Sequence, residues 1–299
     1  MPWDIDYGLL TASQLKKSSY YLDKEYEYSI DFVLNLSSYI VDWDKSKLPK
    51  DFFIKKFKQL ESLIKSAYTD VSFRIYEGDK LYGHLDSQKE VIDKSTNYYI
   101  CLCPDTYFSE HLIPLMVKSA GAIPNEYFLI TSEISKMWDS TWDEITSSKY
   151  MNIPYEKWNE IDIYDLRYKQ KLSPDVKINL EPVTKTKFAG WCDLYNKKFY
   201  EELSPVQDSW SGYGPWDWYS MMISDYAKSQ SVDFSQYIMR GIETFEYSVG
   251  PLKEGGYSKY YKDFLSLKNI PNQRKAFESK MEEYLNKGVS DLKLKGIVK

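Results

Sequence analysis

The alternation of strand and helix patterns in the first third of the chain constrains the fold more than any other feature. Residues 29–37 form an apolar run typical of a buried strand, and residues 71–76 alternate apolar with polar side chains. Between them, apolar side chains recur from Phe53 to Ile64 at the spacing of one helical face, after the start signal Pro49. A strand, a helix and a strand within about fifty residues predict a βαβ unit with parallel strands.

The alternation continues along the chain and then stops. Further patterns predict a polar helix at 87–95, strands at 98–103 and 126–131, and a helix at 112–120. Residues 138–182 are rich in Trp, Asp, Tyr and Lys and contain proline breakers, so we expect loops or a lid there. Beyond them the patterns predict a strand at 188–195, a short helix at 196–203 and a last helix from Pro271 to Gly288.

The composition excludes several classes of protein. Lys and Arg number 39 against 44 Asp and Glu, a formal net charge of −5, so there is no global basic field for nucleic-acid phosphates. No run of about 18 apolar residues occurs and the chain starts Met-Pro-Trp-Asp, so we expect no membrane span and a cytoplasmic protein. Cys101 and Cys103 lie in an apolar run and are expected to be free thiols. The phosphate-loop, dinucleotide-binding and nucleophile-elbow motifs do not occur in the sequence.

Two aspartates are candidates for chemistry. Asp105 directly follows the end of the predicted strand at 98–103, and ligands of open α/β sheets bind at the carboxyl ends of strands. Asp217 lies between two tryptophans in the most distinctive stretch of the chain, Ser-Trp-Ser-Gly-Tyr-Gly-Pro-Trp-Asp-Trp-Tyr at 209–219. The structural alternative is that each aspartate caps a helix, Asp105 before an apolar stretch and Asp217 before a helix over 218–226.

These segments resemble the glycosyltransferases of the GT-A fold. The stretch Phe-Ala-Gly-Trp-Cys-Asp-Leu-Tyr at 188–195, the short helix after it and Trp-Ser-Gly-Tyr-Gly-Pro-Trp-Asp at 210–217 are similar to the acceptor side of the galactosyltransferase-like members. The resemblance implies that Asp217 is the base that takes the proton of the acceptor hydroxyl, with inversion at the anomeric carbon. Asp105 matches the second aspartate of the family's metal-binding Asp-x-Asp motif, and Cys103 stands at the place of the first.

The resemblance also implies the ligands and further site residues. The donor is a nucleotide diphosphate sugar, bound with a divalent metal, Mn or Mg, at Asp105. The acceptor is a glycan, a lipopolysaccharide, a protein side chain or a hydroxymethylated DNA base, of which the acidic balance disfavours the last. The residues expected to bind are Glu77, Asp79 and Asp105 for the donor, and Trp191, Trp210, Tyr213 and Trp216 for the acceptor.

The predicted fold class is α/β, with a GT-A-like (Rossmann-like) mixed, mainly parallel sheet flanked by helices and a C-terminal helical extension. Five segments are expected along the 299 residues. They are an N-terminal extension (1–28), a nucleotide-sugar-binding half (29–137), an irregular insertion or lid (138–182), an acceptor-binding half (183–250) and a C-terminal helical segment (251–299).

Two other functions stay open at this point. A glycoside hydrolase also places two carboxylates among aromatic side chains, but the βαβ order at 29–105 argues against it. A binding protein that kept the fold and lost catalysis would bind a sugar or nucleotide without turnover. The replacement of the first metal-binding aspartate by Cys103 favours this second alternative.

Overall fold

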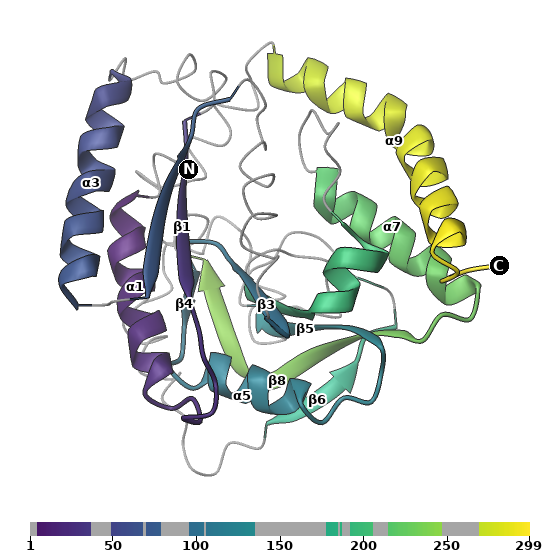
Figure 1. The fold of residues 1–299 in the computed structure, drawn as a ribbon, viewed down its shortest axis with the longest axis horizontal. Coiled ribbons are helices and arrows are strands. Elements are labelled where there is room, and N and C mark those ends of the chain that lie inside the picture. The colour runs from purple at the N-terminus through teal and green to yellow at the C-terminus, as the bar shows by residue number, and fades with distance from the viewer. Residues whose placement is uncertain are drawn as a thin grey trace, which may run out of the picture.

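Figure 1 shows the computed structural model, which describes residues 5–36, 49–67, 70–78, 96–104, 106–134, 178–184, 186, 192–205, 215–246 and 269–299. The helices are α1 (Ile5–Ser19), α3 (Lys50–Ala67), α5 (Leu112–Ala120), the π-helix η5 (Phe199–Leu203), α7 (Pro215–Ser229) and α9 (Asn269–Leu294). The strands are β1 (Ile30–Asn35), β2 (Val71–Tyr76), β3 (Tyr98–Leu102), β4 (Thr106–Phe108), β5 (Tyr127–Ile134), β6 (Asn179–Pro182), β7 (Cys192–Asn196) and β8 (Phe234–Glu246). The chain is a mixed α/β protein.

The βαβ unit predicted near the N-terminus is confirmed. Strands β1 and β2 pair in parallel, and α3 connects them. The apolar face of α3 buries Phe57, Leu60 and Ile64 in a core that β1 shares. Phe32 and Phe73 stack across the two strands with ring centroids 5.2 Å apart. In Figure 1, α1 and α3 lie side by side next to these strands.

The larger sheet is not mainly parallel, so this part of the predicted fold class is wrong. Its strands lie in the order β3-β7-β5-β8-β4, with β6 also paired to β8. Of its pairings only β5 with β8 is parallel; the other four are antiparallel. The reason is that β7, from late in the chain, inserts between β3 and β5 and runs opposite to both. Strands β3, β5 and β8 therefore still run in one direction, although β3 and β5 are not neighbours.

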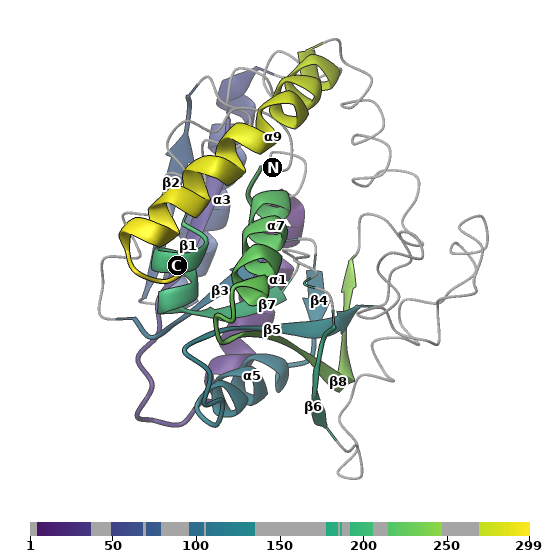
Figure 2. The ribbon, with the colours of Figure 1, turned by 90° about the vertical axis from the view of Figure 1, so that its right-hand side faces the viewer.

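Both faces of the larger sheet are covered, as Figure 2 shows, with α5 on one side and α7 and α9 on the other. Alternation along β5 sends Phe128 and Ile130 into the α5 core, and Tyr127 and Leu129 into the core beneath α7 and α9. We call these two surfaces the α5 face and the α7 face. Because β3, β5, β7 and β8 each contribute to both cores, these strands are fixed in register.

Four elements escaped the sequence patterns, one of them the short strand β4. Helix α1 lies in the predicted N-terminal extension, and it buries the polar residues Thr11, Gln14 and Ser18 together with Ala12. Strand β8 carries a buried Gln236 and breaks its own alternation, so no period of two is visible. Strand β6 falls inside the segment 138–182 that was expected to be irregular, most of which lies outside the described residues.

Helix α9 extends past Gly288, where the sequence predicted its end. Gly288 lies within the helix because the side chain of Tyr219, from α7, occupies the space next to it. The helix ends at Leu294, and Gly296, which follows it, has a φ of +71°. Gly296 N donates to Lys293 O at 3.0 Å and Ile297 N to Leu292 O at 2.9 Å, the pattern of a glycine C-terminal cap.

Replacing Gly288 with alanine is expected to destabilise the protein. An added Cβ would overlap Tyr219 Oη and lie 2.9 Å from Tyr219 Cζ, so we expect a loss of about 1–3 kcal/mol in the free energy of unfolding. Urea denaturation measures it. Gly121→Ala is the matched control, because the nearest atom to its new Cβ would be 3.6 Å away. An increase in stability for Gly288→Ala, as an ordinary helix position gives, would contradict the contact.

The composition also led to expectations about the cysteines and about membrane-spanning helices. Cys101, Cys103 and Cys192 are free thiols, as predicted, with Cys192 buried and the other two half-buried. Burial raises the pKa of the Cys192 thiol, and the neighbouring Asp193 adds to this shift. Within the described part of the chain, no helix has the length and apolar character needed to cross a membrane.

Candidate functional site

A strip of polar side chains crosses the α7 face of the larger sheet near the carboxyl end of β5 and over the first half of β8. The first half of this face is apolar, with Tyr127, Leu129 and Phe234 in the core. Further along the strands, the same two-residue period brings polar side chains to that face. The polar strip consists of Asp193 on β7, Thr131 and Glu133 on β5, Gln236 and Arg240 on β8, and Glu181 on β6. Polar groups at the carboxyl ends of strands are where α/β sheets bind ligands.

Asp193 is the most unusual member of the polar strip, because its side chain is only 1% exposed. Thr131 Oγ1 donates a hydrogen bond to Asp193 Oδ1, and Gln236 Nε2 donates to Thr131 Oγ1 at 3.3 Å. Thr131 and Gln236 are themselves buried. Burying a carboxylate and an amide in a sheet costs free energy unless their hydrogen bonds are satisfied. These two hydrogen bonds offset part of that cost, and they orient the side chains of Asp193, Thr131 and Gln236.

A β-bulge forms the outer end of the polar strip. The register between β5 and β8 shifts after Ser132, so that Glu133 pairs with Glu243 and the intervening residues of β8 bulge out. Gly241 in the bulge has a φ of +87°. Arg240 Nη1 lies 3.1 Å from Glu133 Oε1, and Arg240 Nε lies 3.2 Å from Glu181 Oε2. The bulge thus aims a guanidinium between two carboxylates at the sheet edge.

The first turn of α7 lies over β7, on the same face as the polar strip. Trp216 contacts Tyr195 of β7 edge-on, with ring centroids 5.6 Å apart. Its Nε1 donates to Ser204 O at 2.9 Å, and its side chain is 2% exposed. Trp216 is therefore a core residue in this structure and not the open acceptor surface that the sequence predicted. Asp193 lies two residues from Tyr195 on β7, roughly 7 Å along the strand.

Asp217 is the third residue of α7, which begins at Pro215. The expected helix over 218–226 starts earlier than predicted, since proline suits the first helical position. The helix-cap alternative for Asp217 is therefore wrong. An acidic residue in the first turn still interacts favourably with the helix dipole, worth about 0.3–1 kcal/mol.

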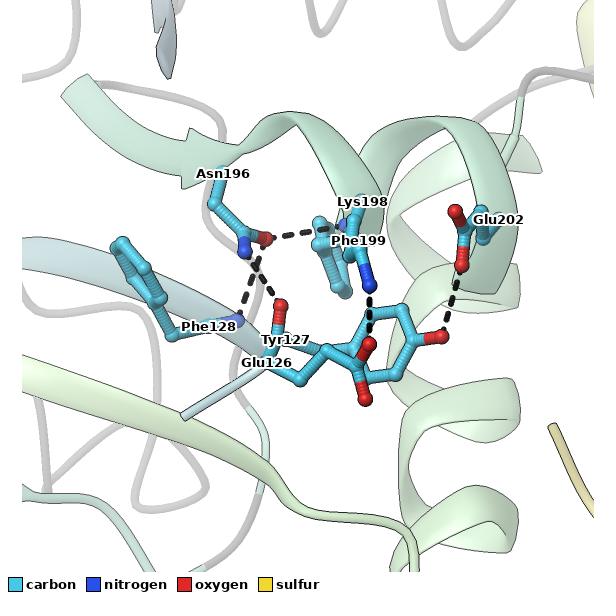
Figure 3. Close-up of polar contacts among 7 residues, drawn as sticks. All are labelled: Glu126, Tyr127, Phe128, Asn196, Lys198, Phe199 and Glu202. Carbon is cyan, nitrogen blue, oxygen red and sulfur yellow. Dashed lines mark hydrogen bonds and ion pairs between the residues drawn. The ribbon is translucent and has the colours of Figure 1, made fainter. Parts of the chain in front are cut away.

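Figure 3 shows the polar contacts that hold β5, β7 and η5 together. Asn196 Oδ1 accepts hydrogen bonds from Phe128 N at 3.3 Å and Phe199 N at 3.0 Å, and its Nδ2 donates to Glu126 O at 2.6 Å. Tyr127 Oη donates to Glu202 Oε2 at 2.8 Å. Burial, reinforced by this carboxylate, raises the pKa of Tyr127. These contacts fix η5, and Ser204 follows η5 directly.

The surroundings of Asp105 are described on both sides, although Asp105 itself lies outside the described residues. Thr106 N donates to Cys103 O at 3.0 Å, and Thr11 Oγ1 donates to Pro104 O. The residue after Asp105 starts strand β4, and the next helix, α5, has His111 as its N-cap. The helix-cap alternative for Asp105 is therefore also wrong. Asp105 follows β3, which ends at the same edge of the sheet as β5 and β8.

Of the remaining predicted site residues, the structure describes only Glu77. Glu77 is exposed after the end of β2, and its Oε2 lies 2.7 Å from Lys50 Nζ. Asp79, Trp191, Trp210 and Tyr213 lie outside the described residues. Among the residues that the structure does describe, no cluster of three or more His, Cys, Asp or Glu side chains could hold a metal ion.

Sequence reasoning missed Asp193, Glu133 and Arg240. Asp193 lies inside the apolar run 188–195, in which the resemblance assigns no role to this aspartate, and only its burial in the sheet distinguishes it. Arg240 has no local signal, because its partners Glu133 and Glu181 are distant in sequence. No model of a known protein family matches the chain, and no curated protein matches it.

Proposed function

We propose that this protein is a glycosyltransferase that moves a sugar from a nucleotide diphosphate donor to an acceptor hydroxyl, with Asp217 as the base. The observation that carries the proposal is the meeting of polar groups at one edge of the larger sheet. Strand β3, which leads to Asp105, ends at the edge where the polar strip lies, and the first turn of α7, with Asp217, covers the same face. The βαβ unit and the loss of both helix-cap alternatives add support.

The proposed chemistry needs few groups from the protein. Asp217 accepts the proton of the acceptor hydroxyl as its oxygen attacks the anomeric carbon, and the bond from that carbon to the diphosphate oxygen breaks. The nucleotide diphosphate leaves with the bonding electron pair. Attack from the side opposite to the leaving group inverts the anomeric carbon, so the product of a transfer should have the inverted configuration by NMR.

The residues next to Asp105 do not fit a Mn or Mg site. These hard cations prefer oxygen ligands, and the first position of the expected motif holds the thiol of Cys103. Pro104 O already accepts a hydrogen bond from Thr11. Asp105 suits the hydroxyl groups of the donor ribose instead, because a carboxylate accepts two hydrogen bonds from a pair of hydroxyls.

Thermal unfolding tests the proposal, because a ligand that binds only the native state raises the midpoint. The panel is the common nucleotide sugars and free nucleotides, each with and without manganese or magnesium. We expect a selective rise with one nucleotide diphosphate and its sugar. A flat response to the whole panel would count against a nucleotide-sugar enzyme.

Asp105→Asn is expected to weaken this response to the donor. Loss of one charge-assisted hydrogen-bond acceptor costs about 1.5–3 kcal/mol, which is roughly a 10- to 100-fold loss in affinity. The measurement is donor titration by calorimetry, with and without a divalent ion. Glu110→Gln, at a half-buried position just before α5, is the control. Unchanged donor affinity in Asp105→Asn would remove Asp105 from the donor site.

A binding protein without catalysis is the second candidate, favoured by Cys103 in the place of a metal-binding aspartate. It predicts the same selective rise in the unfolding midpoint but no transfer and no release of free sugar. Incubation of the bound nucleotide sugar with a panel of acceptors separates the two candidates.

A further inference from the structure

Helix α3 carries large apolar side chains outside its buried face. The buried face packs Phe57, Leu60 and Ile64 into the core that β1 shares. Elsewhere on the helix, Phe52 is 38% exposed and Leu63 is 57% exposed. In Figure 1, α3 is the outermost labelled element on the left side of the molecule. The core therefore explains one face of α3 and leaves two large apolar side chains in contact with solvent.

Phe52 and Leu63 lie along one stripe of the helix. They are eleven positions apart in α3, and at about 100° per residue eleven positions return to within about 20° of the starting direction. Lys55, Gln59 and Ser66 fall in the same sector, which is about 80° wide, and all three are exposed. We call these five residues the α3 stripe. At about 1.5 Å per residue, its two apolar residues are roughly 16 Å apart along the helix axis.

The helix is basic although the whole chain is acidic. Helix α3 contains five lysines and two acidic residues, a formal charge of +3, whereas the chain has a net charge of −5. Two of these lysines, Lys50 and Lys65, have ion-pair partners. Lys55 and Lys58 are exposed and form no ion pair with any residue that the structure describes. Asp51, in the first turn, offsets one of these charges. The α3 stripe thus combines exposed apolar side chains with positive charge that the protein itself does not neutralise.

We infer that the α3 stripe attaches the protein to the surface of an anionic lipid bilayer. Lipid headgroups supply negative charge to Lys55 and Lys58. A third positive charge lies at the end of the stripe, where Lys56 Nζ is 5.6 Å from the centroid of the Phe52 ring. The acyl region beneath the headgroups accepts the side chains of Phe52 and Leu63. The attachment is peripheral, because the buried face of α3 stays in the core.

The combination of apolar and basic side chains favours a bilayer over other anionic partners. A nucleic-acid backbone presents phosphates to lysine side chains but leaves Leu63 in water. A bilayer suits both kinds of side chain, since its charged surface lies directly over its apolar interior. The inference is independent of the proposed function, because it uses neither the polar strip nor Asp105 nor Asp217.

Sedimentation with vesicles tests the inference. The probes are vesicles of phosphatidylcholine alone and of phosphatidylcholine mixed with phosphatidylglycerol. We expect the wild-type protein to bind only the mixed vesicles, and to bind them more weakly as salt is added. Lys55→Ala/Lys58→Ala should lower the partition coefficient about 25-fold, which is about fivefold for each lysine. Leu63→Gln should lower it about tenfold, because glutamine keeps the helix and removes the apolar side chain.

Helix α9 offers a matched control for each change. Lys280→Ala/Lys287→Ala removes two exposed lysines, and Leu294→Gln removes a leucine that is 86% exposed. Both control variants should bind the mixed vesicles as the wild-type protein does. All four variants should unfold near the wild-type midpoint, since every side chain that changes is exposed.

Four results would overturn the inference. They are no binding to the mixed vesicles, an equal loss of binding in the α9 controls, normal binding of Leu63→Gln, and binding to a DNA duplex or an acidic polypeptide in place of the vesicles. Normal binding of Leu63→Gln would mean that charge alone attracts the protein. None of these measurements uses sugar transfer, so each result leaves the proposed function as it stands.

Discussion

Asp217→Asn is expected to lower the rate of sugar transfer by about 10²–10⁴-fold, the range that general-base catalysis contributes. The amide keeps the size of the carboxylate and much of its hydrogen bonding, but it does not accept a proton. Donor binding should therefore stay near normal in calorimetric titration, and the loss should appear in kcat. Because Asp217 is the third residue of α7, the change also removes a favourable interaction with the helix dipole, worth about 0.3–1 kcal/mol of stability.

Asp225→Asn is the matched control for this experiment. Asp225 lies on the same helix, on its exposed face, and is distant from the first turn. The same change of chemistry at this position should leave both transfer and unfolding near the wild-type values. Full activity in Asp217→Asn would eliminate Asp217 as the base. A large loss of stability with donor binding lost as well would indicate that its role is structural.

Trp216→Ala is expected to cost about 3–5 kcal/mol in the free energy of unfolding, the range for removal of a large core aromatic side chain. Three interactions disappear together. The indole loses its edge-on contacts with Tyr195 and Tyr200, at centroid distances of 5.6 and 5.5 Å, and a cavity remains. The buried Ser204 carbonyl also loses the donor Nε1. Urea denaturation monitored by far-UV circular dichroism measures the change.

Two variants show which part of this loss comes from which contact. Trp216→Phe keeps an aromatic ring in the core and removes the hydrogen bond, so we expect a smaller cost of about 1–3 kcal/mol. Trp218→Ala removes a partly exposed indole from the same turn, and we expect a change within about 0.5 kcal/mol. Equal destabilisation by Trp216→Ala and Trp218→Ala would contradict the assignment of one to the core and the other to the surface.

The polar strip explains why the candidate site was only partly predictable. Asp105 and Asp217 were identified because each follows or lies in a recognisable local pattern. Asp193 and Arg240 have no such pattern, since their significance comes from Thr131, Glu133 and Glu181 on neighbouring strands. Side chains that meet only across a sheet are brought together by strand order and register, and neither is encoded in a short stretch of sequence.

The amino-acid sequence by itself determined the local elements. The helix over residues 112–120 was predicted with the bounds that α5 has, and α3 and β1 also follow their predicted ranges closely. The reason is that an amphipathic period and a starting proline act within one or two turns of the chain. These elements need little from the rest of the molecule to be recognised.

Only the tertiary structure decided what those elements do together. It placed β7 between β3 and β5 and so made the larger sheet mainly antiparallel. It carried α9 past Gly288, because Tyr219 fills the space beside that glycine. It also placed Trp216 in the core and Trp218 at the surface, although both are tryptophans in the same turn of α7. The side of a helix that is buried depends on what packs against it, and packing partners far apart in sequence are chosen by the whole fold.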